Sequence, residues 1–140
     1  MENILVAGAN GTTGKKVVAL LNESPYFNPI DMVRKVEQQA YFKAKNIETV
    51  LGDLEGDVSP LFTDSINKVI FAAGSGGTNV IGVDQEGAKK LIDASKKANI
   101  KKFVMLSSIG ADKPEEATQL QEYLKAKHNA DEYLKVSGLN

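Results

Sequence analysis

Two groups of residues in this chain have types and spacings that could do chemistry. Tyr123 and Lys127 lie four residues apart, so on a helix their side chains would share one face. The ammonium of such a lysine favours the phenolate, which lets the tyrosine exchange a proton with a substrate oxygen near neutral pH. The second group is the stretch GANGTTG at residues 8–14, which is typical of a phosphate-binding turn at the start of a helix. Together the two groups predict proton transfer beside a bound phosphate compound.

The glycine-rich stretch fits two kinds of phosphate loop. With Gly8, Gly11 and Gly14 it resembles a dinucleotide turn, where glycines allow a tight turn, close approach of the backbone to pyrophosphate, and close helix–strand packing. Its first glycine lies one residue earlier than in G-x-G-x-x-G, and Ala9 takes the usual place. From Ala9 onward the stretch approaches a triphosphate loop, but Lys16 stands where that loop needs a hydroxyl to hold magnesium. The dinucleotide interpretation is favoured, and the loop residues expected to contact the cofactor are Gly8, Asn10, Gly11, Thr12, Thr13 and Gly14.

Basic residues follow the second apolar run and bear on which dinucleotide is bound. An NAD-binding domain places Asp or Glu there, about 20 residues past the loop, to accept a hydrogen bond from the ribose 2′-hydroxyl. This chain has Arg34 and Lys35 instead, and Asp31 falls inside the expected strand, where its side chain should not reach the ribose. A guanidinium binds a phosphate through paired N–H groups, whereas a carboxylate repels it. We therefore expect NADP in preference to NAD, with a solvated turn as the alternative.

The elements that must position these residues alternate along the chain. Short runs rich in Val, Ile and Leu predict strands buried on both faces. These strands are expected at Asn3–Ala7, Ile30–Val33, Glu48–Leu51, Lys68–Ala73 and Lys102–Leu106. Apolar residues three and four apart predict helices at Thr12–Leu21, Val36–Lys45, Val83–Ala98 and Pro114–Val136, with at most a short helical turn at Ser59–Ser65. Repeated strand–helix–strand crossovers predict a doubly wound α/β fold with a parallel sheet.

Length and composition narrow the class of protein. The 140 residues fit one domain, and 42% hydrophobic with 25% charged residues is typical of globular proteins. A net charge of -1 provides no basic surface for nucleic acid, and no apolar run is long enough to span a membrane. The absence of cysteine excludes disulfides and thiolate metal sites. These features predict a cytoplasmic protein that binds small molecules, without nucleic acid, membrane or metal.

Three motifs that occur in order along the chain resemble the short-chain dehydrogenase/reductase family, particularly its atypical members related to epimerases and NmrA-like proteins. They are GANGTTG at Gly8–Gly14, LSSIG at Leu106–Gly110 and YLKAK at Tyr123–Lys127. Further similarity in GDLEG at 52–56, AAGSGG at 72–77 and the segment 83–103 extends the likeness over nearly the whole chain. The resemblance implies a Rossmann-like fold that binds a nicotinamide dinucleotide.

The resemblance also implies roles for individual residues. Tyr123 would be the acid/base, and Ser108 would hydrogen-bond the reacting oxygen, with Ser107 as the alternative. Lys127 would assist Tyr123 and hold the nicotinamide ribose. Asp84 stands where many family members carry an active-site Asn.

Other positions are assigned to the cofactor by the same resemblance. Asp53 and Leu54 would flank the adenine, and Ala73 with Gly74 would pass beside the cofactor ribose. His128 adjoins the expected active-site lysine but turns to another face of the helix, so we expect it at the surface.

The implied activity is hydride transfer between the nicotinamide and a small carbonyl or alcohol substrate, by an NADP-dependent oxidoreductase or epimerase. A non-enzymatic NADP-binding sensor and a scaffold domain are the alternatives. Family members ordinarily continue past this point into a further strand and a substrate segment, so the chain is expected to be the cofactor-binding part of a longer fold or a minimal natural chain. The fifth strand would then be an unpaired sheet edge, which predicts either association with another chain, such as a second copy, or marginal stability.

Overall fold

Five parallel strands form one sheet in the order β3-β2-β1-β4-β5. The computed structural model describes all residues from Met1 to Asn140. The strands are β1 (Glu2–Ala7), β2 (Phe27–Val33), β3 (Glu48–Leu51), β4 (Ile66–Phe71) and β5 (Lys102–Met105). The helices are α1 (Thr12–Glu23), α2 (Val36–Lys43), α3 (Glu86–Lys97) and α4 (Gln121–Val136), with short turns η1 (Ser59–Leu61), η2 (Val80–Gln85) and η3 (Pro114–Glu116). This arrangement confirms the predicted doubly wound α/β fold.

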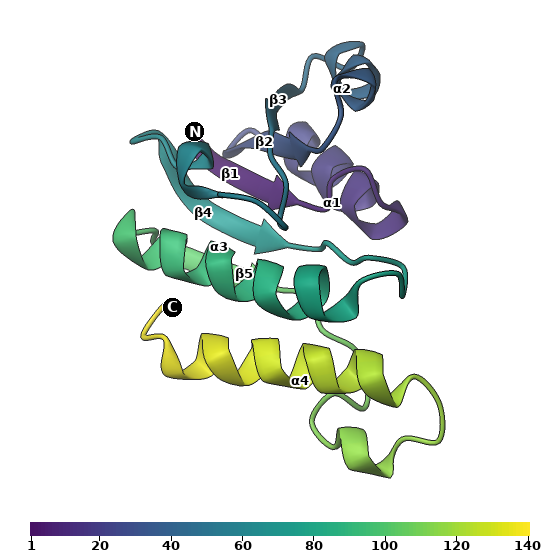
Figure 1. The fold of residues 1–140 in the computed structure, drawn as a ribbon. Helices are drawn as coiled ribbons and strands as arrows, with labels where there is room; N and C mark the ends of the chain where they lie inside the picture. The colour runs from purple at the N-terminus through teal and green to yellow at the C-terminus, as the bar shows by residue number, and fades with distance from the viewer.

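Helices cover both faces of the sheet, with α3 and α4 in front of it and α1 and α2 behind it (Figure 1). Alternate residues of β1 face opposite ways, as the pleat of a strand requires. Leu5 and Ala7 belong to a core cluster with residues of α3 and α4, whereas Ile4 and Val6 belong to a second cluster with residues of α1 and α2. Both faces of the central strand are therefore apolar, and this explains why the sequence shows continuous apolar runs instead of alternation.

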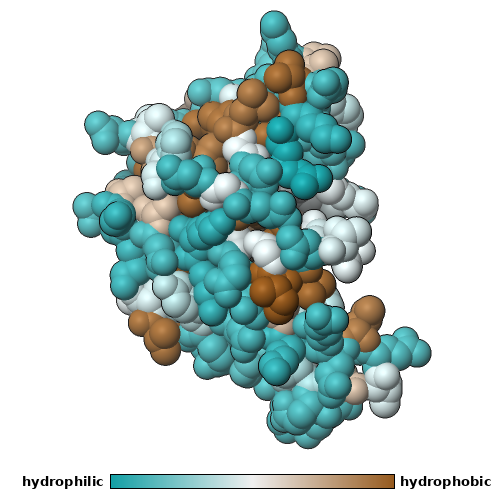
Figure 2. All heavy atoms as spheres, viewed as in Figure 1, coloured by the Kyte–Doolittle hydropathy of each residue, from teal (hydrophilic) through white to brown (hydrophobic).

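The outer surface over α3 and α4 is largely hydrophilic, and hydrophobic residues show only in separate patches (Figure 2). No helix of the chain is both long enough and apolar enough to cross a membrane.

The second strand begins earlier than the sequence pattern predicted. The expected start was Ile30, but β2 begins at Phe27 and includes Pro29, which lies opposite Ile4 of β1. A proline interrupts the hydrogen bonding of a strand that has neighbours on both sides. It is tolerated here because β3 pairs with β2 only from Ile30 onward, so Pro29 has a neighbouring strand on one side alone.

The predicted helix at Pro114–Val136 is wrong in its first part. Pro114 starts only a short 3-10 turn, and α4 begins at Gln121. Between them Ala117 is extended, and Leu120 adopts the left-handed conformation with φ of 55°, which no α-helix can continue through. Tyr123 consequently lies in the first turn of α4, and Lys127 lies one turn further along.

The predicted helix at Val83–Ala98 is also divided. Its first residues belong to η2, a π-helical segment from Val80 to Gln85, and α3 starts at Glu86. A π-helical turn contains one more residue than an α-helical turn and is common at functional sites. Asn99 adopts the left-handed conformation just after α3, with φ of 54°.

The outer edge of β5 carries one hydrogen bond from another part of the chain. The backbone N–H of Phe103 donates to the carbonyl oxygen of Asn140 at 2.9 Å, so the segment after α4 lies against this edge. β4 is the only strand that pairs with β5. As predicted, no further strand pairs with the outer edge of β5, and the hydrogen bond to Asn140 is the one backbone contact made there.

Candidate functional site

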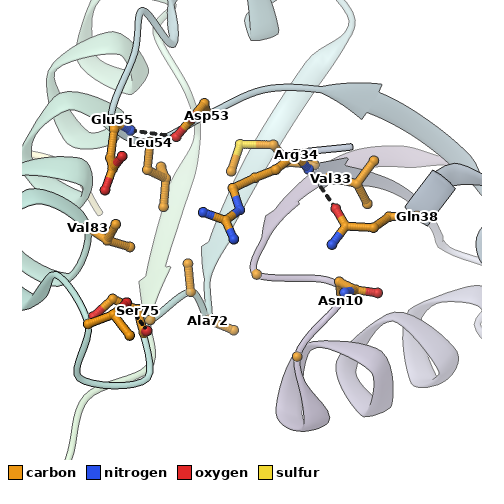
Figure 3. A pocket seen from close by; sticks show the side chains of 16 residues that line it. Asn10, Val33, Arg34, Gln38, Asp53, Leu54, Glu55, Ala72, Ser75 and Val83 are labelled. Atoms are coloured by element: carbon orange, nitrogen blue, oxygen red, sulfur yellow. Dashed lines mark hydrogen bonds between the residues drawn. The ribbon is translucent and has the colours of Figure 1, made fainter. Parts of the chain in front are cut away.

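A cleft of about 270 Å³ opens at the carboxyl ends of the parallel strands, where doubly wound sheets bind their ligands (Figure 3). Its walls come from the turn after β1, the end of β2 with the first turn of α2, the loop after β3, and the loop after β4. The lining residues are Gly8, Asn10, Gly11, Met32, Val33, Arg34, Gln38, Asp53, Leu54, Glu55, Ala72, Ala73, Gly74, Ser75, Thr78 and Val83.

The glycine turn has the backbone geometry that a pyrophosphate needs. Gly8 has φ of +90°, and a Cβ at this position would lie 2.5 Å from backbone atoms of Ala72 and Ala73. A Cβ on Gly14 would lie 1.8 Å from the carbonyl oxygen of Gly8, so the start of α1 packs directly on the turn. Gly11 faces the cleft, and there the nearest heavy atom to such a Cβ is 3.4 Å away. Gly8 and Gly14 therefore fix the turn through close packing. Gly11 leaves space in which a phosphate can approach the backbone N–H groups at the start of α1.

The lysine that a triphosphate loop would use points elsewhere. The ammonium of Lys15 lies 4.4 Å from the centroid of the Tyr41 ring, in a groove between α1 and α2 that is separate from the cleft. Lys16 is exposed on α1. Neither lysine lines the cleft, which supports the dinucleotide interpretation of the loop.

Three predicted residues of the loop lie outside the cleft wall. Thr12 and Thr13 are exposed in the first turn of α1, and Gly14 is buried behind the turn. Asn10 is exposed and lines the cleft.

The end of β2 places Arg34 in the lining of the cleft, whereas Lys35 is exposed away from the lining. The two backbone N–H groups of Arg34 and Lys35 both donate to the Gln38 side-chain oxygen, at 3.0 and 3.1 Å. No acidic side chain forms a salt bridge with Arg34.

Asp31 is fully buried inside β2 and does not line the cleft. Neither of its carboxylate oxygens has a hydrogen-bond partner. Burial in these apolar surroundings raises the pKa of Asp31 to about 7.

The opposite wall of the cleft carries the predicted adenine contacts Asp53 and Leu54 together with Glu55 (Figure 3). The Asp53 carboxylate accepts a hydrogen bond of 2.9 Å from the backbone N–H of Glu55. The side-chain amide of Asn79 donates to Glu55, and its oxygen accepts from the backbone N–H of Gly82 at the start of η2. This pair of contacts joins the loop after β3 to the loop after β4.

Two of the expected catalytic residues, Ser108 and Tyr123, are in contact, although neither lines the cleft. The Ser108 Oγ and the Tyr123 Oη are 3.1 Å apart, so the loop after β5 and the first turn of α4 meet through these hydroxyl groups. The side-chain amide of Asn129 donates to Gln85 at 2.7 Å and fixes α4 against η2.

Lys127 has an unusual environment for a lysine. It is only 2% exposed, and its ammonium lies 3.8 Å from the Met105 sulfur and 5.3 Å from the centroid of the Phe71 ring. Burial lowers the pKa of Lys127, and the negative charges of Asp131 and then Asp84 oppose that decrease.

Asp84 is 1% exposed and is held by Ser75. Its carboxylate accepts from the Ser75 backbone N–H at 3.3 Å and from the Ser75 hydroxyl at 2.9 Å. A Cβ on Gly74 would lie 3.0 Å from the same carboxylate, so Asp84 supports the cleft wall formed by Ala73, Gly74 and Ser75 from behind.

The residues next to Ser108 and Lys127 in the sequence, Ser107 and His128, make contacts of their own. Ser107, the alternative to Ser108, donates its hydroxyl to Asp131 and not to Tyr123. His128, expected at the surface, is half-buried, and its Nδ1 lies 2.8 Å from the Ala111 carbonyl oxygen. The loop after β5 folds back over α4 and covers this face of the helix.

The sequence did not indicate four residues that shape the cleft, namely Gln38, Glu55, Ser75 and Asn79. Gln38 follows a possible helix start and has the residue type that caps the first turn of a helix, which is a signal that could have found it. The other three depend on contacts between loops, for which the sequence carries no pattern.

Comparison with known proteins agrees with this geometry. Residues 8–140 match the family described as NAD(P)H-binding. The chain is 38% identical to the uncharacterized sugar epimerase YhfK of Bacillus subtilis, over 97% of this chain and 67% of that protein. A Bacillus halodurans structure assigned as a NAD-dependent epimerase/dehydratase has a TM-score of 0.91 and 37% identity, and the match covers 99% of this chain and 67% of that one. The oxidoreductase ylbE of Lactococcus lactis has a TM-score of 0.85 and 31% identity, covering 98% and 65%.

The chain spans about two thirds of the length of these relatives. Within that span, the glycine turn and the cleft at the strand ends lie inside the matched region. The chain therefore belongs to the NAD(P)H-binding family, and the resemblance to atypical short-chain dehydrogenases/reductases is confirmed.

Proposed function

We propose that this chain is the NADP-binding part of an oxidoreductase or epimerase that acts by hydride transfer on a small carbonyl or alcohol substrate. The observation that carries this proposal is the 3.1 Å contact between Ser108 and Tyr123, with the buried Lys127 one helical turn beyond the tyrosine. A nicotinamide, when bound, would supply or accept the hydride. A domain that only senses the cofactor would not need this hydroxyl pair, and for this reason the enzyme is favoured over the sensor.

Each of the three side chains has a distinct part in the proposed proton transfer. Ser108 donates a hydrogen bond to the substrate oxygen and so places it against Tyr123. Tyr123 gives its proton to that oxygen as the carbonyl is reduced, or takes it in the reverse direction. The positive charge of Lys127 stabilises the resulting phenolate, and burial makes this interaction stronger than it would be in water.

The preference for NADP is supported by the end of β2. Arg34 lines the cleft without an acidic partner, and its guanidinium points into the cleft in Figure 3. A guanidinium in this position suits a 2′-phosphate, which a carboxylate would repel.

The catalytic assignment is tested with Tyr123→Phe in single-turnover oxidation of NADPH against a panel of small carbonyl compounds. We expect the rate to fall by about two orders of magnitude or more, while the dissociation constant for NADPH stays within about twofold. Tyr133→Phe is the matched control, because Tyr133 lies on the same helix and donates its hydroxyl to Asp93 outside the cleft. Equal rates for Tyr123→Phe and the parent protein would contradict the assignment.

The cofactor assignment is tested separately by calorimetric titration with NADPH, NADH and ATP. Arg34→Ala should weaken NADPH binding by about tenfold and leave NADH binding nearly unchanged. Failure of the parent protein to bind either nicotinamide dinucleotide would contradict the proposed function as a whole.

A further inference from the structure

Gln38 has a side-chain amide whose orientation is fixed by the backbone around it. Its oxygen accepts two hydrogen bonds, from the backbone N–H groups of Arg34 at 3.0 Å and Lys35 at 3.1 Å. Both donors are backbone groups at the start of α2, so they cannot turn away, and only an oxygen satisfies them. The amide nitrogen must therefore occupy the other branch of the side chain.

That nitrogen faces the cleft. Gln38 lines the cleft, and Figure 3 shows its oxygen directed at the Arg34 backbone while its nitrogen lies on the side of Asn10. The nitrogen donates no hydrogen bond within the protein, so its N–H groups remain for a ligand.

At this end of the cleft Arg34 and Gln38 consequently offer two sets of donors, and no carboxylate lies beside them. The Arg34 guanidinium has only N–H donors, and the Gln38 oxygen is already occupied by the backbone. The carboxylates of Asp53 and Glu55 lie on the opposite wall, where they are held by the Glu55 backbone N–H and by Asn79. A ribose 2′-hydroxyl can accept hydrogen bonds from these donors, but its own proton also needs an acceptor, whereas an ionised 2′-phosphate only accepts and carries the charge that a guanidinium attracts.

We propose that Gln38 selects the phosphorylated dinucleotide. Its fixed amide directs N–H donors at the place where the ribose 2′ position would lie, while its oxygen is already bonded to the backbone. This inference rests on the proposed NADP-dependent function and deepens it. Arg34 supplies the positive charge that attracts the 2′-phosphate. Gln38 makes the position bind a 2′-hydroxyl more weakly than a 2′-phosphate, because it offers the hydroxyl no acceptor.

Gln38→Glu is the decisive substitution. One carboxylate oxygen can accept the same two backbone hydrogen bonds, so the start of α2 should be retained. The second oxygen would replace a donor with a negatively charged acceptor, which suits a 2′-hydroxyl and repels a 2′-phosphate. We expect the ratio of NADH to NADPH dissociation constants to fall by about tenfold or more, through weaker NADPH binding.

Gln39→Glu is the matched control. It makes the same change of charge one residue further along, where the Gln39 amide donates to the Thr49 hydroxyl at 2.9 Å and does not line the cleft. For this variant, the ratio of NADH to NADPH dissociation constants should stay within about twofold of the ratio for the parent protein. An equal shift in both variants would mean that the effect is one of general charge, and this would overturn the inference.

The dissociation constants are measured by the change in fluorescence of NADPH and NADH on binding, after thermal melting has shown that each variant is folded. Should Gln38→Glu be unfolded, Gln38→Met removes the amide donors together with the oxygen that accepts the two backbone hydrogen bonds, and it should weaken NADPH binding while sparing NADH. An unchanged ratio in a folded Gln38 variant overturns the inference on Gln38. A parent protein without preference for NADPH overturns instead the proposed NADP dependence, so the two failures are distinguishable.

Discussion

Asp84 accepts two hydrogen bonds from Ser75, one from the backbone N–H at 3.3 Å and one from the hydroxyl at 2.9 Å. These bonds keep a negative charge buried between the wall of the cofactor cleft and the helix that carries Lys127. The charge of Asp84 also opposes the decrease that burial causes in the pKa of Lys127. Asp84 is thus positioned to preserve the positive charge on which the proposed phenolate depends.

Replacement of Asp84 by Asn should lower the pKa of Lys127 further, because one of the two carboxylates that favour the charged lysine is lost. Lys127 would then lose its proton at a lower pH, and the alkaline limb of the pH–rate profile should move toward neutral pH. The profile of Ser75→Ala, which retains the Asp84 charge, is the control. Identical alkaline limbs in Asp84→Asn and the parent protein would exclude this role.

Substitution of the loop glycines should separate a structural role from a binding role. Gly14→Ala should lower the free energy of unfolding by about 2 kcal/mol or more, because its Cβ would lie 1.8 Å from the Gly8 carbonyl oxygen. Gly11→Ala has more room, at 3.4 Å from the same oxygen, and should fold almost normally. It should nevertheless weaken dinucleotide binding by about tenfold, because the methyl group enters the space of the phosphates.

Thermal melting and calorimetric titration of the same preparations check this pair of predictions. Full cofactor affinity in Gly11→Ala would show that phosphate does not approach this turn closely.

Asp31 should make the protein less stable as the pH rises from about 4 to about 7. Its pKa is raised from 3.8 to about 7 in the folded state, so within this range the unfolded chain has released a proton that the folded chain retains. The unfolded state therefore binds fewer protons, and the free energy of unfolding falls with pH, by roughly 4 kcal/mol in total. Above pH 7 both states are ionised and this contribution no longer changes.

Denaturant unfolding of the parent protein and of Asp31→Leu at several pH values measures this effect. The leucine variant should lack the contribution of Asp31 and be the more stable protein at pH 8. Parallel pH curves for the two proteins would show that Asp31 is not the source of the slope.

Leu120 should be a site where glycine stabilises the fold. Its φ of 55° costs a residue with a side chain about 1 kcal/mol, and at 72% exposure the leucine has little packing to lose. Leu120→Gly should therefore raise the free energy of unfolding by up to about 1 kcal/mol. Leu20→Gly, at an equally exposed position inside α1, should instead lower it by about 1 kcal/mol.

The sequence predicted the sheet and the phosphate turn well, because both depend on local signals. Apolar runs of the right length mark the strands, and the glycines of the first turn follow a strand and precede a helix. The sequence failed at the fourth helix, since apolar spacing continues through Ala117 and Leu120 while the backbone leaves the helical conformation.

The candidate site was predicted in part for a related reason. Arg34 could be placed because it directly follows a buried strand, and Ser108 and Tyr123 because each belongs to a motif. The role of Gln38 depends on which way its amide turns, and the contact of Glu55 with Asn79 joins residues 24 positions apart. Such properties arise only when the loops are packed together, so no pattern of residue types could reveal them.

The π-helical segment from Val80 to Gln85 makes the wall of the cleft sensitive to the length of the chain. Its extra residue resembles a one-residue insertion into an otherwise continuous helix. Deletion of a single residue there would let the segment become α-helical and rotate the preceding side chains by about 100° relative to α3. Asp84 could not then keep both its contact with Ser75 and its place beside α4, so this part of the chain should accept changes of residue type far more readily than changes of length.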